Sequence, residues 1–174
     1  MTIIIQGLLL LALAMLATAA MHDVMARTVP NRLAASLAAT GLGLQAIQGS
    51  LLFGTLAALA VFFAAVLCWR RGWMGGGDVK LLGATALLVP PASVPALVAA
   101  ISLFGGALAL IYLLARHRVT TSHIGLPRGL VARAIRAERW RLRRGGPLPY
   151  AVAIACGAAF IILTSINPMQ GLQQ

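Results

Sequence analysis

The sequence predicts an all-α membrane protein with six transmembrane helices and both termini outside the cytoplasm. Two observations on composition predict this fold class: 60% of the 174 residues are hydrophobic while only 10% are charged, and the mean hydropathy is +0.92. The third observation is that apolar segments recur along the chain, most of them near the ~20 residues that cross ~30 Å of hydrocarbon. Such a composition excludes an ordinary soluble domain.

The expected transmembrane segments are separated by polar connections. They cover residues 3–20, 33–47, 51–69, 79–89, 94–115 and 148–166. The fourth segment is short and ends at Pro90 and Pro91, because proline cannot continue a helix. Such a short segment can be accommodated in three ways: the glycine-rich residues before it extend the helix, the helix tilts little, or it lies partly inside the bundle. We expect one membrane domain over residues 1–174.

The first segment is expected to stay in the protein rather than to be removed as a signal peptide. The residues Ala17-Thr18-Ala19 do resemble a cleavage site. A signal peptide also has a positively charged start, however, and residues 1–6 carry no positive charge. The first segment is therefore counted as a helix of the mature protein.

Charge predicts the orientation of the segments. The chain has fourteen Lys and Arg against three Asp and Glu, a net charge of +11. The positive residues lie in or beside the connections after the first, third and fifth segments, and none lies near Gln48, near Pro91 or after Asn167. The positive-inside rule makes the charged side cytoplasmic. Topology therefore explains the basic charge, and we expect no nucleic acid as a partner.

The longest connection covers residues 116–146. Within it, residues 129–144 combine apolar residues at helical spacing with many arginines, which predicts a basic amphipathic helix on the membrane surface. Anionic headgroups attract such a helix, so membrane lipid is an expected partner and anchoring is the preferred role. The alternative is that this helix docks an acidic substrate segment or a partner protein.

The cysteines and histidines predict no metal site and no other cofactor. Cys68 and Cys156 lie far apart, form no CxxC pair and are interpreted as small core residues. His22, His117 and His123 lack the spacing of metal ligands.

Only three acidic residues occur, Asp23, Asp78 and Glu138, and the first two lie where an apolar segment meets polar sequence. Ionisable groups near the hydrocarbon are costly, and they mark functional sites. Two carboxylates that meet can share a proton, which makes one an acid and the other a base. We therefore predict that Asp23 and Asp78 converge in the fold and are catalytic.

Asp78 follows three glycines, Gly75, Gly76 and Gly77, in the pattern GxGD. Glycines cost backbone entropy in a helix, but without Cβ atoms they allow close approach to another helix or to a peptide. They also allow irregular backbone where a segment lines a watery cavity. The structural alternative is a glycine-rich turn in which Asp78 caps the helix that follows.

Other polar residues beside the two aspartates are expected to support the site. Pro30 suits the start of a helix and Asn31 can hydrogen-bond locally to fix that turn. Arg27 can pair with Asp23, although an exposed ion pair contributes little stability.

The remaining candidates flank the fourth and sixth segments. Lys80 either stabilises negative charge near the site or binds an acidic residue of the substrate; the alternative is a snorkelling lysine that extends to the headgroups. Pro149 and Tyr150 begin the last segment. Tyr150 can hydrogen-bond toward the site, but an ordinary interfacial aromatic role is preferred.

Together the stretches DVMARTVPN, GGGDVK and LPYAVAI, in this order on a six-segment frame, resemble the type IV prepilin peptidases, which are GxGD intramembrane aspartic proteases. The small size resembles the CpaA/TadV-like branch, which serves tight-adherence (Flp) pili. The resemblance maps the two catalytic aspartates onto Asp23 and Asp78. Family members often show Pro-Tyr-Gly where this chain has Pro149-Tyr150-Ala151, a difference that concerns only how the last helix begins.

The resemblance implies an enzyme of the bacterial cytoplasmic (inner) membrane, multi-pass, that hydrolyses a prepilin near a short positive leader. It implies a prepilin substrate and contact with the pilus assembly machinery. Larger members carry a region with paired CxxC motifs tied to N-methylation, for which Asp23 to Leu33 leaves no room. The signal peptide peptidase and presenilin relatives pair GxGD with a Tyr-Asp motif, whereas this chain has His22-Asp23.

Two other functions remain as alternatives. A small transporter or channel can use intramembrane aspartates as ion sites. Paired broken helices in two repeats are typical of transporters, whereas this sequence has one glycine break and no repeat. A non-enzymatic assembly factor would instead use the basic helix at 129–144 to hold a pilus motor.

Overall fold

The structure, a computed structural model, describes residues 2–118 and 148–166. The described residues form helices and no strand, which confirms the all-α prediction. The elements are α1 (Thr2–Ala26), α2 (Asn31–Ile47), α3 (Leu51–Arg70), α4 (Gly76–Ala86), the 3-10 turn η1 (Pro91–Ser93), α5 (Val94–Arg118) and α7 (Tyr150–Ile166). The basic helix predicted at 129–144 lies outside the described residues.

Three helical stretches are long and apolar enough to cross a membrane: Ile3–Ala26, Leu51–Arg70 and Pro91–Ala115. A shorter apolar helix covers Tyr150–Ser165. A helix forms in each of the six predicted segments. The helices α2 and α4, with 17 and 11 residues, are not among the candidate membrane spans. The six-span topology and the outward termini stay predictions.

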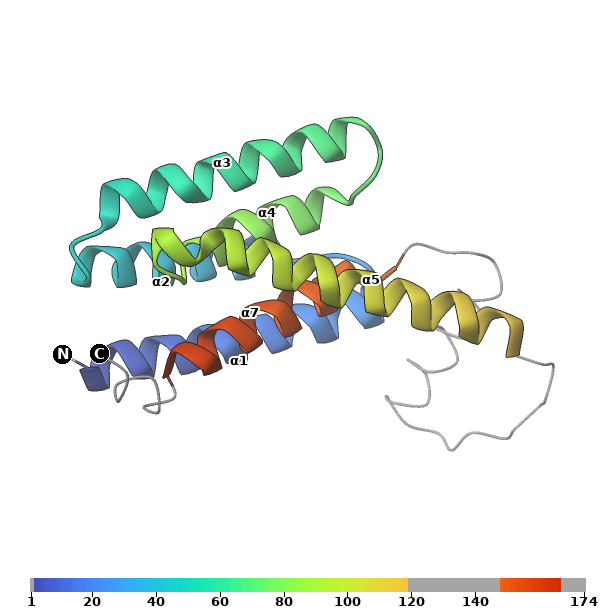
Figure 1. Cartoon of the computed structure of the whole chain (residues 1–174), viewed down its shortest axis with the longest axis horizontal. Coiled ribbons are helices and arrows are strands. Elements are labelled where there is room, and N and C mark those ends of the chain that lie inside the picture. Colours follow the sequence, from blue (N-terminus) through green and yellow to red (C-terminus); the bar gives the residue numbers. More distant parts are fainter. Residues whose placement is uncertain (1, 119–147, 167–174) are drawn as a thin grey trace.

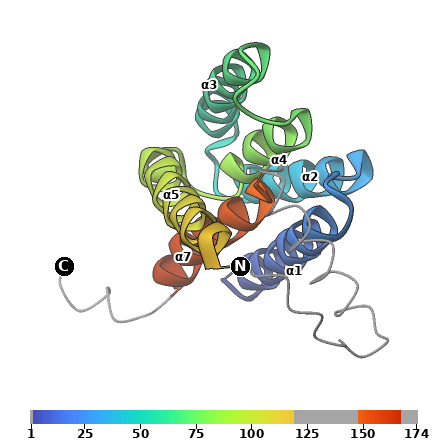
Figure 2. The same cartoon turned by 90° about the vertical axis from the view of Figure 1, so that its right-hand side faces the viewer.

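The short helix α4 lies at the centre of the bundle. It packs against α2, α3 and α7, and Figures 1 and 2 show it between α2 and α3. Its residues from Val79 onward are almost all buried, as are Leu87, Leu88 and Val89 after it. Because α2, α3 and α7 pack against α4, most of this helix is covered by protein, and its short length is tolerated. The prediction that this segment lies partly inside the bundle is confirmed.

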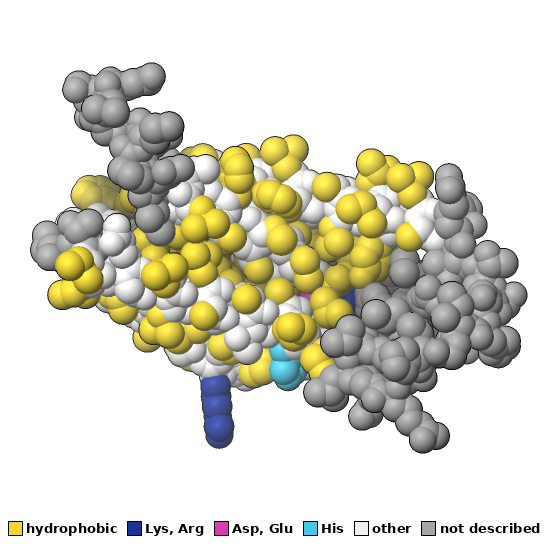
Figure 3. Space-filling model, turned by 90° about the horizontal axis from the view of Figure 1, so that it is seen from below, with side chains coloured by type: hydrophobic (Ala, Val, Ile, Leu, Met, Phe, Trp, Pro, Cys, Tyr) yellow, Lys and Arg dark blue, Asp and Glu magenta, His cyan; other side chains and the backbone are white. Residues whose placement is uncertain are grey.

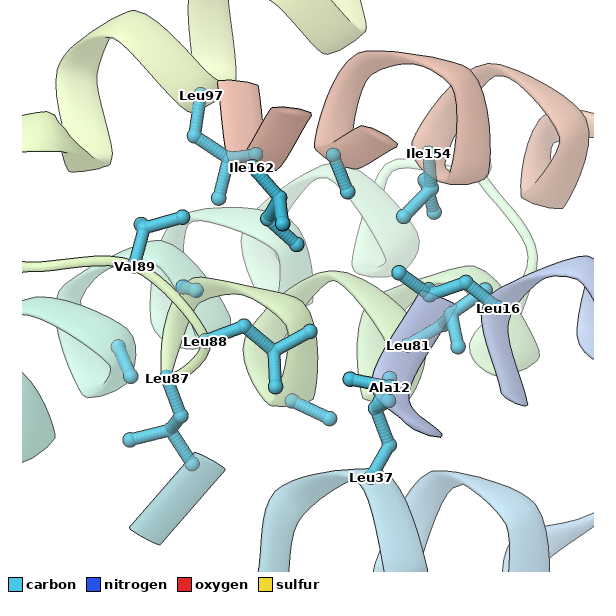
Figure 4. Close-up of a cluster of buried hydrophobic side chains, with 14 of the residues drawn as sticks. Ala12, Leu16, Leu37, Leu81, Leu87, Leu88, Val89, Leu97, Ile154 and Ile162 are labelled. Carbon is cyan, nitrogen blue, oxygen red and sulfur yellow. The ribbon is translucent and has the colours of Figure 1, made fainter. Parts of the chain in front are cut away.

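The central core joins helices that are distant in the sequence. Leu16 of α1, Leu37 of α2, Leu81 of α4 and Ile154 of α7 are all fully buried in one cluster (Figure 4). The strongest pairings are α5 with α7 and α1 with α7, and α1 and α7 run antiparallel to each other (Figure 1). Since lipid is as apolar as these side chains, the helices associate by close packing rather than by escape from water.

A buried glutamine closes the end of α4 opposite to Asp78. Gln45 Nε2 donates hydrogen bonds to the carbonyl oxygens of Leu87 (3.1 Å) and Val89 (2.8 Å), and Ser50 Oγ donates to Gln45 Oε1 (2.6 Å). The last carbonyls of a helix lack partners within the helix, and Pro90 has no N–H to offer them. Gln45 therefore satisfies backbone groups that would otherwise be buried without partners.

The described surface is mainly hydrophobic. Figure 3 shows hydrophobic side chains over most of the visible described surface, with only a small area of acidic side chain. Large apolar residues on α3 and α5 are exposed, among them Phe53, Phe63, Leu103 and Ile111. Contiguous exposed apolar surface of this extent marks a membrane interaction.

Candidate active site

The two aspartates line one cavity of about 440 Å³ at one end of the bundle. Asp23 comes from the last turns of α1, and Asp78 comes from the first turn of α4. The rest of the wall consists of Arg27, the loop residues Gly72, Trp73, Met74 and Gly75, and Leu148 and Tyr150 at the start of α7. The structure thus brings the two predicted acids to the same cavity from helices that are remote in the sequence.

Asp23 lies inside α1, which continues to Ala26 rather than ending at residue 20 as predicted. Nothing between residues 20 and 26 breaks a helix, so the hydrogen-bond ladder continues past the apolar segment. Asp23 is only 6% exposed. Its Oδ2 accepts a hydrogen bond of 3.3 Å from the backbone N–H of Ala151, the second residue of α7. The first N–H groups of a helix lack partners and carry partial positive charge, so the start of α7 is a natural partner for this carboxylate.

The chain leaves α1 through a strained residue. Arg27 has φ +56°, and its backbone N–H donates to the carbonyl oxygen of Asp23 at 2.8 Å. This left-handed geometry commonly ends helices, but glycine normally occupies it, because any other L-residue pays about 1–2 kcal/mol. The turn places Arg27 in the wall of the cavity. Its pairing with Asp23 stays a prediction.

Asp78 is the third residue of α4, and Gly75 is the N-cap. The Asp78 carboxylate nonetheless bonds back to the backbone of Gly75, as the third residue of a capping box does. The capping alternative therefore describes part of what Asp78 does, although Asp78 is not the N-cap itself. The same side chain faces the cavity, so capping and a role in the site coexist.

The pKa of Asp78 is raised from 3.8 to about 6. Burial of the carboxyl is the largest cause, and the negative charge of Asp23 is the second. The hydrogen bond from Gly75 and the positive charge of Arg27 act in the opposite direction. Asp78 lies directly before the apolar segment 79–89 and lines the cavity. The two carboxylates are therefore coupled electrostatically, as the sequence predicts for a pair that shares a proton.

The glycine run allows close approach, as predicted. A Cβ atom on Gly75 would lie 3.0 Å from Asp78 Oδ2, and one on Gly77 would lie 3.3 Å from Cβ of Val29. A Cβ atom on Gly76 would lie 3.4 Å from the indole nitrogen of Trp69. Gly76 and Gly77 are already helical, so irregular backbone in this run is limited to Gly75.

The supporting residues take roles that differ in part from the predicted ones. Pro30 is the N-cap of α2, as expected. Asn31 Oδ1 accepts a hydrogen bond of 2.9 Å from Lys80 Nζ, so Asn31 joins α2 to α4 rather than only fixing its own turn. Lys80 is exposed and is absent from the cavity wall, so the structure gives no support to its predicted role beside the aspartates.

Tyr150 forms part of the cavity wall rather than a lone interfacial ring. It is half-buried, and a Cβ atom on Gly105 of α5 would lie 3.1 Å from its Cε2. Pro149, the residue directly before α7, is buried. These two residues fix the position of the N–H that Ala151 offers to Asp23.

Sequence analysis missed two components of the site. The Ala151 donor is a backbone group, so no side-chain type identifies it. Trp73 is 71% exposed at the rim of the cavity, with the guanidinium of Arg71 5.3 Å from its ring centre. A tryptophan beside a cation and before a glycine run is a signal for an interfacial loop, and it was available in the sequence.

Comparison with known proteins identifies a family. The model of the type IV leader peptidase family matches residues 10–110, which is more than half of the chain and includes Asp23 and Asp78. No curated protein and no solved structure matches. Within residues 2–118 and 148–166, no three His, Cys, Asp or Glu side chains gather as a metal site would require. On its sequence match, the chain belongs to the type IV leader peptidase family.

Proposed function

We propose that this protein is an intramembrane aspartic endopeptidase that removes the leader peptide of type IV, Flp-like prepilins at the cytoplasmic face of the inner membrane. The observation that carries the proposal is the convergence of Asp23 and Asp78 on one cavity, with the charge of one raising the pKa of the other. Family membership supports a leader peptidase and disfavours the transporter and the non-enzymatic assembly factor.

The chemistry follows from the different surroundings of the two carboxyl groups. We assign the shared proton to Asp78, because burial and the negative charge of Asp23 raise its pKa, and in the protonated form it polarises the scissile carbonyl. Asp23, which accepts the N–H of Ala151, is the ionised base that takes a proton from water. The hydroxide equivalent adds to the carbonyl carbon, and the tetrahedral intermediate collapses when the leaving amine receives a proton. No covalent bond to the enzyme forms.

Charge at the cavity end supports the cytoplasmic location. Positive residues gather at the same end of the helices as the cavity, and they are Arg27, Arg32, Arg70, Arg71 and Lys80. Under the positive-inside rule this end faces the cytoplasm. A prepilin with its leader in the cytoplasm and its apolar helix in the membrane then presents the bond between them at the level of the aspartates.

The short connection between α1 and α2 supports cleavage without methylation. Only residues 27–30 separate α1 from α2, so no additional domain fits between them. We therefore propose that the protein acts as a peptidase alone.

The test is cleavage of a co-expressed small prepilin by the full chain in membranes. Asp23→Asn and Asp78→Asn each retain shape and remove a titrating group, so each is expected to abolish cleavage while the protein accumulates normally. Arg32→Gln changes an exposed cation near the same end and is expected to leave cleavage intact. Mass spectrometry of the pilin maps the cut. Normal cleavage by either asparagine variant would refute the dyad.

A further inference from the structure

A second cavity lies between α2, α3 and α4, and it has about 600 Å³ of space. Its wall is almost wholly apolar and contains several small residues, such as Ala35, Ala38 and Gly83. The helix pairs α3–α4 and α2–α4 pack closely, whereas α2 and α3 make few contacts with each other. Figure 2 shows α4 between α2 and α3, and residues of all three helices line the cavity, so we call it the groove.

This groove is separate from the active site. The two cavities share no lining residue. Lys80 lines the groove, whereas Asp78, two positions earlier on α4, lines the active site. Two positions correspond to roughly 200° around a helix, which places the groove and the aspartates on different sides of α4. A peptide bond held between the aspartates therefore lies outside the groove.

The groove has the length of one membrane leaflet. Along α2 its lining runs from Asn31 to Leu42, which is about 16 Å at the rise of an α-helix. Half of the ~30 Å hydrocarbon core is about 15 Å. The extended acyl chain of a lipid in the leaflet nearest Asp78 therefore matches the groove in length.

A single cation marks one end of this apolar groove. Lys80 is exposed, and its Nζ donates to Asn31 Oδ1 at 2.9 Å. An ammonium group has three N–H donors, so two remain for another acceptor. Hydrogen bonds from an ammonium to a phosphate are charge-assisted and strong. No acidic residue belongs to the lining, so the groove combines an apolar length with one positive end.

We propose that this groove binds an anionic phospholipid, with one acyl chain between α2 and α3 and the phosphate on Lys80 and beside Asn31. Charge favours this occupant over the alternatives. Lys80 would repel the basic leader of a prepilin. It would also repel a second copy of the chain that approached with the end carrying its described cations. The proposal does not depend on peptidase activity, because the aspartates lie outside the groove.

The experiment is native mass spectrometry of the purified full chain in detergent, titrated with phosphatidylglycerol, phosphatidylcholine or inorganic phosphate. We expect one phosphatidylglycerol to remain bound, with weaker retention of phosphatidylcholine and no displacement by phosphate. Lys80→Gln is expected to weaken phosphatidylglycerol binding about fivefold, the contribution of one cation near a lipid surface. Ala35→Phe fills the groove from an exposed position and is expected to weaken both lipids.

Matched controls separate the groove from the general surface. Arg70→Gln removes an exposed cation from the end of α3, and Ala64→Phe adds the same ring on α3 outside the groove. Neither is expected to change lipid retention. Asp78→Asn is expected to retain lipid even if it loses cleavage, so failure of the lipid proposal is distinguishable from failure of the peptidase proposal.

Three results would overturn the proposal. Equal binding of both lipids with no effect of Lys80→Gln would show only nonspecific apolar contact. Displacement of lipid by inorganic phosphate would show a phosphate site without a chain. Displacement of lipid by an apolar pilin segment, or by a second copy of the chain, would assign the groove to a protein helix.

Discussion

The backbone N–H of Ala151 donates a hydrogen bond of 3.3 Å to Asp23 Oδ2, across 128 positions of sequence. It joins the start of α7 to the last turns of α1, where the proposed base lies. The donor belongs to the backbone, so an alanine at this position keeps the contact as well as the glycine that the family resemblance leads us to expect. The departure from Pro-Tyr-Gly is therefore compatible with the proposed chemistry.

The first prediction removes that donor. Ala151→Pro deletes the N–H at a position in the first turn of α7, where proline is tolerated better than in a helix interior. A hydrogen bond to a charged group contributes roughly 1.5–3 kcal/mol, so we expect the rate of prepilin cleavage to fall roughly ten- to a hundredfold. Ala151→Gly keeps the donor and is expected to stay active. Equal rates for the two variants would show that this contact does not serve catalysis.

The second prediction concerns pH. If Asp78 must be protonated, kcat/KM falls as pH rises through about 6, because the acid form is lost above the pKa of Asp78. The positive charge of Arg27 lowers the pKa of Asp78, so Arg27→Gln is expected to raise that pKa and move this limb of the profile to higher pH. Arg32→Gln serves as the control and leaves the limb in place. A limb that stays fixed or moves to lower pH in Arg27→Gln contradicts the assignment.

The third prediction tests close packing at the glycine run. Gly75 has φ −74° and ψ 147°, which alanine adopts freely, but the added Cβ would lie 3.0 Å from Asp78 Oδ2. Gly75→Ala is therefore expected to displace the carboxylate and to slow cleavage by up to roughly a hundredfold, the effect of a small misplacement at a reacting group.

Gly43→Ala is the matched control for this change, because a Cβ there meets nothing within 4 Å. Alanine is a better helix former than glycine, so this variant is expected to cleave normally and to be no less stable. Comparable activity of Gly75→Ala and Gly43→Ala would show that the approach of Asp78 to Gly75 is unimportant.

The fourth prediction concerns stability rather than catalysis. Gln45→Leu leaves the carbonyl oxygens of Leu87 and Val89 without their side-chain donor, at a cost of roughly 1–3 kcal/mol. The midpoint of thermal unfolding in detergent should fall, while the folded fraction cleaves at the normal rate because Gln45 is remote from the aspartates. Gln48→Leu changes an exposed glutamine on the same turn and should unfold near the normal temperature. An unchanged unfolding midpoint for Gln45→Leu would show that the hydrogen bonds of Gln45 do not stabilise the fold.

The sequence by itself determined the all-α class, the six helical segments and the two aspartates as the candidate pair. These follow from local properties: hydropathy over about twenty residues, and rare carboxylates beside apolar segments. Sequence reasoning placed the end of α1 too early, because hydropathy marks where apolar residues stop, whereas the helix continues to Ala26 until the backbone turns at Arg27.

Only the tertiary structure decided which groups meet. The bond from Ala151 to Asp23, the pairing of Lys80 with Asn31 and the burial of Gln45 beneath Leu87 join residues 128, 49 and 42 positions apart. Helix packing sets these contacts, and two of the three use backbone atoms that every residue carries. Residue type therefore identifies the proposed catalytic acids, whereas the groups that contact them and the groove along α4 depend on how the helices pack around that short central helix.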